Sequence, residues 1–170
     1  SGPSKLLAFK NMKVSLASIE ITPQVRRNIK KALDEGRIGK GDFVQSFEKK
    51  FAKYIGTKYA VFVSSGTMAD TLAVAALDSR GMDIIVPALT FVAQVNAGVA
   101  AGCHPVFADV DFRGQLDPAE VEKKITPHTV AIFATHLLGR VANMDALQKI
   151  AGANDIALLE DCCESLGAKW

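Results

Sequence analysis

Cysteine is scarce in this chain of 170 residues, which contains only Cys103, Cys162 and Cys163. Two of the three are adjacent, which is poor geometry for a disulfide framework. A disulfide-stapled secreted domain is therefore excluded, and we expect a protein of the reducing cytoplasm. Because the adjacent pair lacks a C-x-x-C partner, we predict buried thiols and no metal site.

Strong charge and long apolar runs are also lacking. The formal net charge is +2, which leaves no basic excess for nucleic acid and no acidic run typical of a disordered tail. No apolar run approaches the roughly 20 residues that a membrane-spanning helix needs. With 49% hydrophobic residues, the composition indicates a globular domain that binds neither nucleic acid nor a membrane.

Two nucleotide-binding motifs are missing as well. Without a G-x-x-x-x-G-K-[ST] loop, Asp161 is not expected to hold Mg²⁺ as in a nucleotide hydrolase. Without a G-x-G-x-x-G turn after a strand, a nicotinamide dinucleotide is also disfavoured.

What the sequence does contain is a series of apolar runs, most of them separated by plausible helices. The runs lie at residues 58–63, 83–86, 105–108, 129–135 and 156–160. Near-continuous apolar strands that alternate with helices are typical of a parallel sheet buried on both faces. We therefore predict an α/β fold, with a mostly parallel, doubly wound sheet and helices on both faces.

Helix signals dominate the part of the chain before the first run. Thr22 followed by proline starts one helix, and Asp42 starts another that stops at Gly56. We predict an N-terminal helical segment over residues 1–57 and a sheet domain over 58–170. Because the chain stops soon after its last strand without a closing helix, we expect the sheet domain to be incomplete at its C-terminal end.

The turn over residues 63–70 is the most informative stretch. An apolar run stops at Ser64-Ser65-Gly66-Thr67, and an Ala- and Leu-rich helix is predicted over 67–77. Backbone N–H groups at such a helix start lack partners and lie at the positive end of the helix dipole, so the turn can bind a phosphate or another anion. An ordinary strand–helix connection capped by Ser or Thr explains the same residues.

Further candidate residues follow the other predicted strands, whose carboxyl ends meet on one rim of a parallel sheet. They are Phe91, Asp109, Asp111, His136 and Asp161. A flat, cationic, phosphorylated heteroaromatic cofactor would place its phosphate on Gly66, Thr67 and Met68, its ring face on Phe91 and its ring nitrogen against Asp161. Pyridoxal phosphate is such a ligand.

Simpler interpretations exist for the individual residues. An isolated aromatic such as Phe91 is commonly part of a core, and Asp109 and Asp111 are spaced like turn residues. We expect His136 to be a supporting polar group and not a catalyst.

A longer set of motifs occurs in order at consistent spacing. They include Gly39-Lys40-Gly41, Ser64-Ser65-Gly66-Thr67, Thr90-Phe91-Val92-Ala93, Asp109-Val110-Asp111, His136-Leu137-Leu138-Gly139 and Glu160-Asp161. From about Ile21 to its last residue, the chain thereby resembles the DegT/DnrJ/EryC1/StrS family of sugar aminotransferases. These are pyridoxal-phosphate enzymes of fold type I, and the sheet domain would be part of their large domain.

The resemblance implies roles for residues and partners. Thr67 and Met68 would contact the cofactor phosphate, Phe91 would stack on the pyridine ring, and Asp161 would pair with the ring nitrogen. The implied reaction transfers an amino group, commonly from glutamate, to a nucleotide-linked keto sugar at the interface of a homodimer.

Two departures from the family pattern change these expectations. Glu164 stands where the aminotransferases usually have Gln or His against the phenolic oxygen of the cofactor, and with Cys163 it resembles the sugar 3-dehydratase branch. That branch has His in place of the Schiff-base Lys. The Schiff-base position is expected beyond Trp170, and Lys169 is too close to Asp161 to fill it.

We therefore expect no catalytic residue within this chain, which by itself would be inactive. A dehydratase and a non-catalytic regulatory relative remain the alternatives to an aminotransferase.

Overall fold

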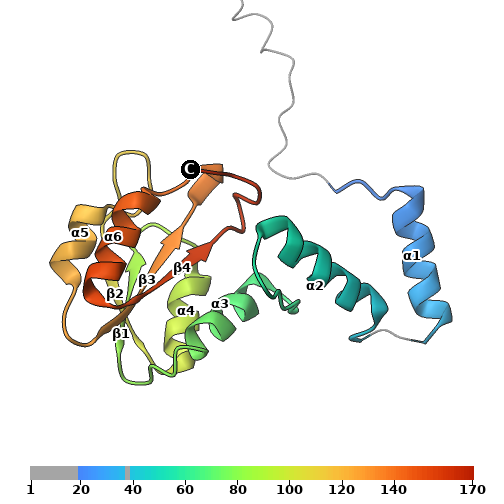
Figure 1. Ribbon diagram of the computed structural model, residues 1–170, viewed down its shortest axis with the longest axis horizontal. Coiled ribbons are helices and arrows are strands. Elements are labelled where there is room, and N and C mark those ends of the chain that lie inside the picture. The colour runs from blue at the N-terminus through green and yellow to red at the C-terminus, as the bar shows by residue number, and fades with distance from the viewer. Residues whose placement is uncertain (1–18, 37–38) are drawn as a thin grey trace, which may run out of the picture. The chain divides into compact units, whose positions relative to one another are not determined.

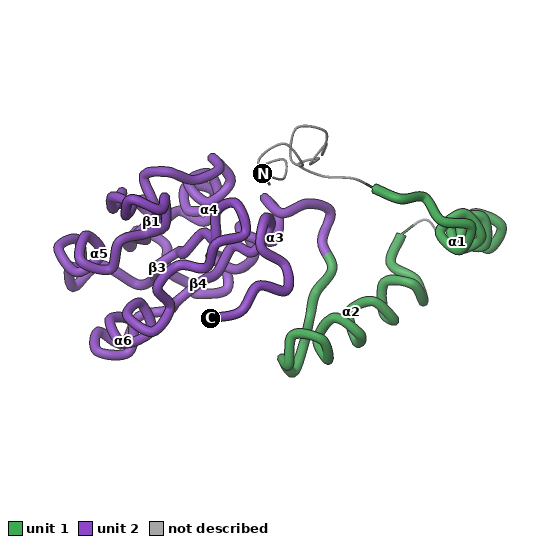
Figure 2. Tube along the Cα trace, turned by 90° about the horizontal axis from the view of Figure 1, so that it is seen from above, with its two compact units in different colours: residues 1–62 green, residues 63–170 purple. Residues whose placement is uncertain are grey.

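The computed structural model describes residues 19–36 and 39–170. The chain divides into two compact units between Phe62 and Val63 (Figure 2). Among the described residues, no helix combines the length and the apolar character needed to cross a membrane.

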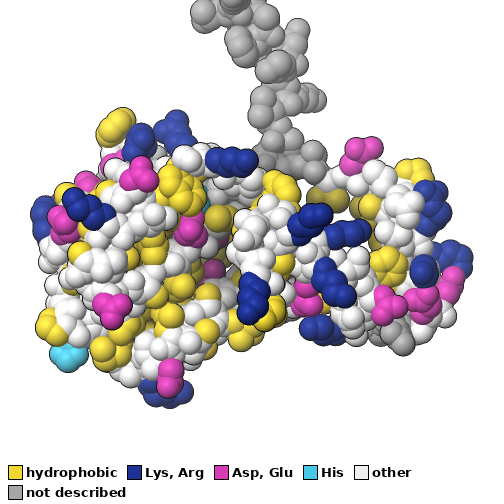
Figure 3. All heavy atoms as spheres, viewed as in Figure 1, with side chains coloured by type: hydrophobic (Ala, Val, Ile, Leu, Met, Phe, Trp, Pro, Cys, Tyr) yellow, Lys and Arg dark blue, Asp and Glu magenta, His cyan; other side chains and the backbone are white. Residues whose placement is uncertain are grey.

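The first unit contains two helices, α1 (Pro23–Asp34) and α2 (Asp42–Ile55). Their predicted ends are confirmed: the Thr22 hydroxyl accepts a hydrogen bond from the Val25 N–H, and Gly56 ends α2 in the left-handed conformation, with φ +85°. No residue of α1 is buried, and α2 buries only Ala52. Hydrophobic side chains consequently reach the surface among lysines and arginines, as the face in Figure 3 shows.

The strand predicted over residues 58–63 is wrong. The segment forms no strand, and the side chains of Tyr59 and Val61 are 74% and 73% exposed. An apolar run becomes a strand only when another strand lies beside it, and none of the strands in the described part of the chain pairs with this segment. The Phe62 N–H instead donates to a carboxylate oxygen of Glu48 in α2, at 3.0 Å.

The second unit is built on a four-stranded sheet in the order β2-β1-β3-β4. Its elements are α3 (Gly66–Ala75), β1 (Asp83–Pro87), α4 (Val92–Ala101), β2 (His104–Ala108), α5 (Pro118–Lys124), β3 (Thr129–Thr135), α6 (Met144–Asn154) and β4 (Ala157–Asp161), with a short 3₁₀ turn, η2, over Leu137–Gly139. All neighbouring strands are parallel. The last four predicted strands are therefore confirmed to within a residue or two.

Helices cover both faces of this sheet (Figure 1). Ile84 and Val86 point to one face, where they form a core with Val74 of α3 and Ala97 of α4. Ile85, between them, points to the other face. There it belongs to a second core together with residues of α5 and α6, including Val121, Met144, Leu147 and Ile150. The alternation along β1 confirms the doubly wound α/β prediction.

The strand order creates a switch point between β1 and β3. From β1 the chain passes outward to β2 and then returns to the other side of β1 to form β3. Connections on the two sides of such a point leave in opposite directions, which opens a crevice at the carboxyl ends of the strands. The rim predicted from the sequence lies at these strand ends.

Candidate functional site

Helix α3 begins with backbone N–H groups that are not hydrogen-bonded within the described part of the chain. Ser65 is the N-cap, and its hydroxyl accepts a hydrogen bond from the Met68 N–H at 3.3 Å. The N–H groups of Gly66 and Thr67 have no acceptor in the described part of the chain. Of the three predicted phosphate-binding residues, these two thus retain a free backbone donor, whereas the Met68 N–H is occupied.

The start of α3 lies against the turn that follows β4. A Cβ atom added to Gly66 would come within 3.1 Å of the Cys163 Sγ, so only glycine leaves ordinary space there. The predicted anion-binding turn and the predicted ring-nitrogen partner, Asp161, are thereby brought to one place. Residues four apart share a helix face, which directs Asp70 toward the same turn.

Asp70 is a buried carboxylic acid that the sequence analysis missed. It is 7% exposed, and its Oδ2 atom has no hydrogen-bond partner among the described residues. Burial, followed by the charge of Asp161, raises the pKa of Asp70 to about 6. A single charged residue within helix α3 was the signal that could have revealed it.

Asp161 ends β4 and is held by several hydrogen-bond donors. Its Oδ1 atom accepts from the Cys163 N–H at 2.9 Å, and its Oδ2 atom accepts from the side-chain amide of Gln94. Interaction of the Cys163 thiol with the Asp161 side chain, together with burial, raises the thiol pKa to about 12. Both oxygens of the Asp161 side chain therefore accept hydrogen bonds from neighbouring residues.

Gln94 is the second residue that the sequence analysis missed. It lies in α4, is fully buried, and connects Asp161 to a pair of threonines. The Thr90 hydroxyl donates to the Gln94 Oε1 at 2.7 Å, and the hydroxyls of Thr90 and Thr135 lie 2.8 Å apart. This network spans the switch point, because Thr90 follows β1, Thr135 ends β3 and Asp161 ends β4.

Phe91 precedes α4 as its N-cap residue, and its side chain is 69% exposed. It is therefore not part of the core, and its ring is free to stack on a ligand at the carboxyl end of β1. Asp111 is a turn residue, as its spacing predicted. Its Oδ1 atom accepts hydrogen bonds from the N–H groups of Gln115 and Arg113. Both bonds lower the pKa of Asp111, and the bond from Gln115 has the larger effect on that pKa.

His136 supports the chain after β3. It is 3% exposed, its Nδ1 atom accepts from the Ala142 N–H at 3.2 Å, and its Nε2 atom lies 2.9 Å from a Glu160 carboxylate oxygen. Because Nδ1 is an acceptor, the neutral ring carries its hydrogen on Nε2 and donates it to Glu160.

The potential ligand atoms of His136, Glu160 and Cys162 lie within 4.8 Å of one another. A metal ion there would have to displace the hydrogen from Nε2 of His136. It would also need the Cys162 thiolate, whose formation partial burial opposes by raising the thiol pKa. Hydrogen bonding therefore explains this cluster better than metal ligation. The prediction that the adjacent thiols are buried is wrong, because Cys162 and Cys163 are both exposed.

Glu164 is exposed, and its side chain is hydrogen-bonded to the η2 turn. Its Oε2 atom accepts from the Leu138 N–H at 2.7 Å. Leu138 has φ +55°, a left-handed conformation that a leucine rarely adopts, so the bond helps to hold a strained backbone. Glu164 and the η2 turn thus line the same rim as Asp161.

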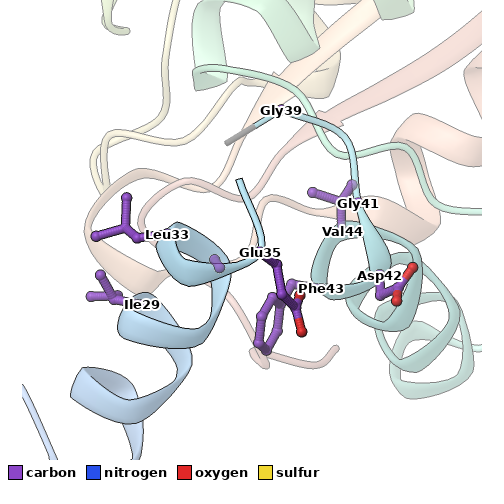
Figure 4. A pocket seen from close by; sticks show the side chains of 9 residues that line it. Ile29, Leu33, Glu35, Gly39, Gly41, Asp42, Phe43 and Val44 are labelled. Carbon is purple, nitrogen blue, oxygen red and sulfur yellow. The ribbon is translucent and has the colours of Figure 1, made fainter. Parts of the chain in front are cut away.

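The first unit carries a pocket of its own, of about 300 Å³, between α1 and α2 (Figure 4). It is lined by Ile29, Ala32, Leu33, Glu35, Gly39, Gly41, Asp42, Phe43 and Val44. None of the residues predicted to bind a cofactor is among them.

Taken together, the rim of the second unit offers anion donors, an exposed aromatic ring and two buried acids. Two carboxyl groups in one buried site, one of them with an unpartnered oxygen, favour a ligand that brings a positive charge or a donor N–H. A phosphorylated cation with an aromatic ring satisfies all three features, and the protonated pyridine ring of pyridoxal phosphate is such a group.

Comparison with known proteins gives a consistent result. The sequence model of the DegT/DnrJ/EryC1/StrS aminotransferase family matches residues 20–170. The chain is 38% identical over 153 residues to a GDP-perosamine synthase of Escherichia coli O157:H7, covering 88% of this chain and 42% of that protein. It is 35% identical over 147 residues to a dTDP-3-amino-3,6-dideoxy-alpha-D-galactopyranose transaminase of Aneurinibacillus thermoaerophilus, covering 85% and 40%.

A solved structure has the same fold. It is the E. coli GDP-4-keto-6-deoxy-D-mannose-3-dehydratase with bound hydrated PLP, with a TM-score of 0.84 at 37% identity over 91% of this chain and 42% of that chain. The chain thus spans about two fifths of the length of the curated relatives it matches.

Proposed function

This chain belongs to the DegT/DnrJ/EryC1/StrS aminotransferase family, and we propose that it forms the cofactor-binding part of a pyridoxal-phosphate-dependent enzyme. The proposed reaction transfers an amino group, with glutamate as the donor, to a keto sugar linked to a nucleotide. The observation that carries the proposal is the approach of Gly66 to Cys163, which brings the start of α3 beside Asp161.

Each predicted binding residue has a distinct role in this proposal. The backbone N–H groups of Gly66 and Thr67, with the Thr67 hydroxyl, bind the phosphate at the positive end of α3. Met68 lies in the same turn, but its N–H is held by Ser65, so it shapes the phosphate site without donating to it. Phe91 covers one face of the ring.

Asp161 accepts the N–H of the pyridine ring. Pyridoxal phosphate, when bound, supplies an electron sink for the carbon next to the amino group, and a protonated ring nitrogen strengthens it. Asp161 suits this task because its oxygens already receive hydrogen bonds from Cys163 and Gln94, which fix the orientation of its carboxyl group.

The remaining parts of the proposed enzyme are supported by the family likeness. In the proposed enzyme, the lysine that holds the cofactor lies beyond Trp170. We propose a cytoplasmic homodimer, with the site completed by residues outside this chain and by the partner subunit.

A sugar 3-dehydratase is the second candidate, and Glu164 is the residue that favours it. A carboxylate at this position would repel the phenolic oxygen of the cofactor unless one of the two carries a proton. At 37% identity, the E. coli dehydratase is about as similar to this chain in sequence as the GDP-perosamine synthase is at 38%. A regulatory relative that binds the cofactor without turnover is the third candidate.

Borohydride trapping on the complete protein separates these candidates. The protein is loaded with pyridoxal phosphate, treated with borohydride, and analysed by intact mass and peptide mapping. A covalent adduct on one lysine downstream of Trp170 supports the aminotransferase. Cofactor that binds but is never trapped points to the dehydratase or the regulatory relative, and a protein that binds no cofactor overturns the proposal.

A further inference from the structure

Gln94 is a fully buried polar residue within a helix that is otherwise composed of small and apolar residues together with Asn96. Burying a side-chain amide is costly unless both of its ends are hydrogen-bonded. Both ends of Gln94 are satisfied, the oxygen by Thr90 and the nitrogen by Asp161. The amide is thus held between two fixed groups.

The hydrogen bonds of this network can run in only one direction. The single hydroxyl hydrogen of Thr90 is donated to the Gln94 Oε1, so the Thr135 hydroxyl must donate to Thr90. If the Gln94 amide were turned over, its oxygen would face the Asp161 carboxylate and its NH₂ group would lose Asp161 as acceptor. The order Thr135 to Thr90 to Gln94 to Asp161 therefore fixes an N–H donor on the Asp161 Oδ2 atom.

We propose that Gln94 is a positioning residue of the cofactor site, which holds Asp161 as an oriented carboxylate so that the proton between Asp161 and the cofactor resides on the ring nitrogen. Thr90 and Thr135 orient Gln94 for this role. The inference rests on the proposed function, because it concerns the proton shared between Asp161 and the ring nitrogen of the proposed cofactor.

The reason lies in the balance of one shared proton. A proton between a carboxylate and a pyridine nitrogen can lie on either group, and each N–H donor on the carboxylate stabilises the charged pair. Asp70 is buried nearby but makes no hydrogen bond to Asp161. When ionised it adds negative charge, so it cannot replace Gln94 as the donor. Without Gln94, the Oδ2 atom would lose its donor, and the proton would move toward Asp161.

The test is ¹⁵N NMR of pyridoxal 5′-phosphate labelled at the ring nitrogen and bound to the complete protein. The ¹⁵N chemical shift distinguishes a protonated from a neutral pyridine ring. We expect a protonated ring in the wild type. In Gln94→Leu, which removes the donor at similar size, we expect the shift to move toward the neutral ring, with about a tenfold or larger change in the ratio of the two forms.

Two further variants make the outcome decisive. Thr90→Val leaves Gln94 in place but removes the hydroxyl that orients it, and we expect a smaller displacement of the shift in the same direction. Gln148→Leu makes the same exchange at an exposed position of α6 and should leave the shift unchanged.

A Gln94→Leu protein that binds the cofactor with the wild-type shift would overturn the inference. If Gln94→Leu does not fold, an unchanged shift in Thr90→Val would overturn it instead. A wild type that binds no labelled cofactor would overturn the proposed function, and this inference with it, so the two failures are distinguishable.

Discussion

The carboxyl group of Asp70 should make the protein less stable as the pH rises. Burial and the charge of Asp161 raise its pKa from the ordinary 3.8 to about 6. In the unfolded chain the group ionises at its ordinary pKa, so between these two values the folded protein binds a proton that the unfolded chain has released. The free energy of unfolding therefore decreases between about pH 4 and pH 6 and stays reduced above that range.

The size of the effect follows from the two pKa values. The interval between 3.8 and about 6 corresponds to about 3 kcal/mol, at about 1.4 kcal/mol per pH unit. Because Gly66 and Cys163 beside Asp70 are exposed, water screens part of this cost, and we expect about 2 kcal/mol. Asp70→Asn keeps the size of the side chain and removes its ionisation. The variant should be more stable than the wild type by this amount at pH 8 and nearly equal to it at pH 4.

Urea unfolding without cofactor, followed by circular dichroism at several pH values, measures this difference. Asp155→Asn is a matched control, since Asp155 is exposed and has φ +53°, a conformation that asparagine tolerates. Its stability difference from the wild type is the baseline against which the pH dependence of Asp70→Asn is compared. A difference between Asp70→Asn and the wild type that is the same at pH 4 and pH 8 would refute the reasoning.

Two further predictions concern glycines and the η2 turn. A Cβ atom at Gly98 would lie 2.5 Å from the Ile84 Cδ1, so Gly98→Ala should destabilise the protein by about 1–3 kcal/mol. Gly152→Ala in α6, where the new Cβ meets nothing within 4 Å, should stabilise it by about 0.5–1 kcal/mol, and thermal unfolding of the two variants compares them. In Glu164→Ala, the Leu138 N–H loses its acceptor, so hydrogen exchange at that amide should become faster. Unchanged exchange would argue against the role of Glu164 in holding the turn.

The strands were predictable because their burial is nearly complete. Residues 129–135 read as one apolar run, and β3 has these bounds with six of its seven residues buried. The run over residues 58–63 looked similar, but a run carries no information about whether a partner strand lies beside it. That information depends on the whole topology, which local apolar character does not contain.

The candidate site was predictable where it follows an apolar run or begins a helix. Asp161 directly follows the predicted run over residues 156–160, and Phe91 lies in the short turn after β1, so a parallel sheet was enough to bring them to one rim. Gln94 and Asp70 lie inside helices, and their importance comes from contact with Asp161, which is 67 residues from Gln94 along the chain. A polar residue in a mostly apolar helix was the available signal, but such a residue does not show which distant residue it interacts with.

The position of the Cys163 thiol beside Asp161 determines how the protein reacts with electrophiles. Because its pKa is raised to about 12, the Cys163 thiol is almost entirely protonated at pH 7. Alkylating reagents and peroxides react with the thiolate, so this exposed cysteine should be modified slowly despite its accessibility. A nucleophile beside a site proposed for an aldehyde cofactor is thereby kept in its unreactive form, and the aldehyde is spared a competing sulfur adduct.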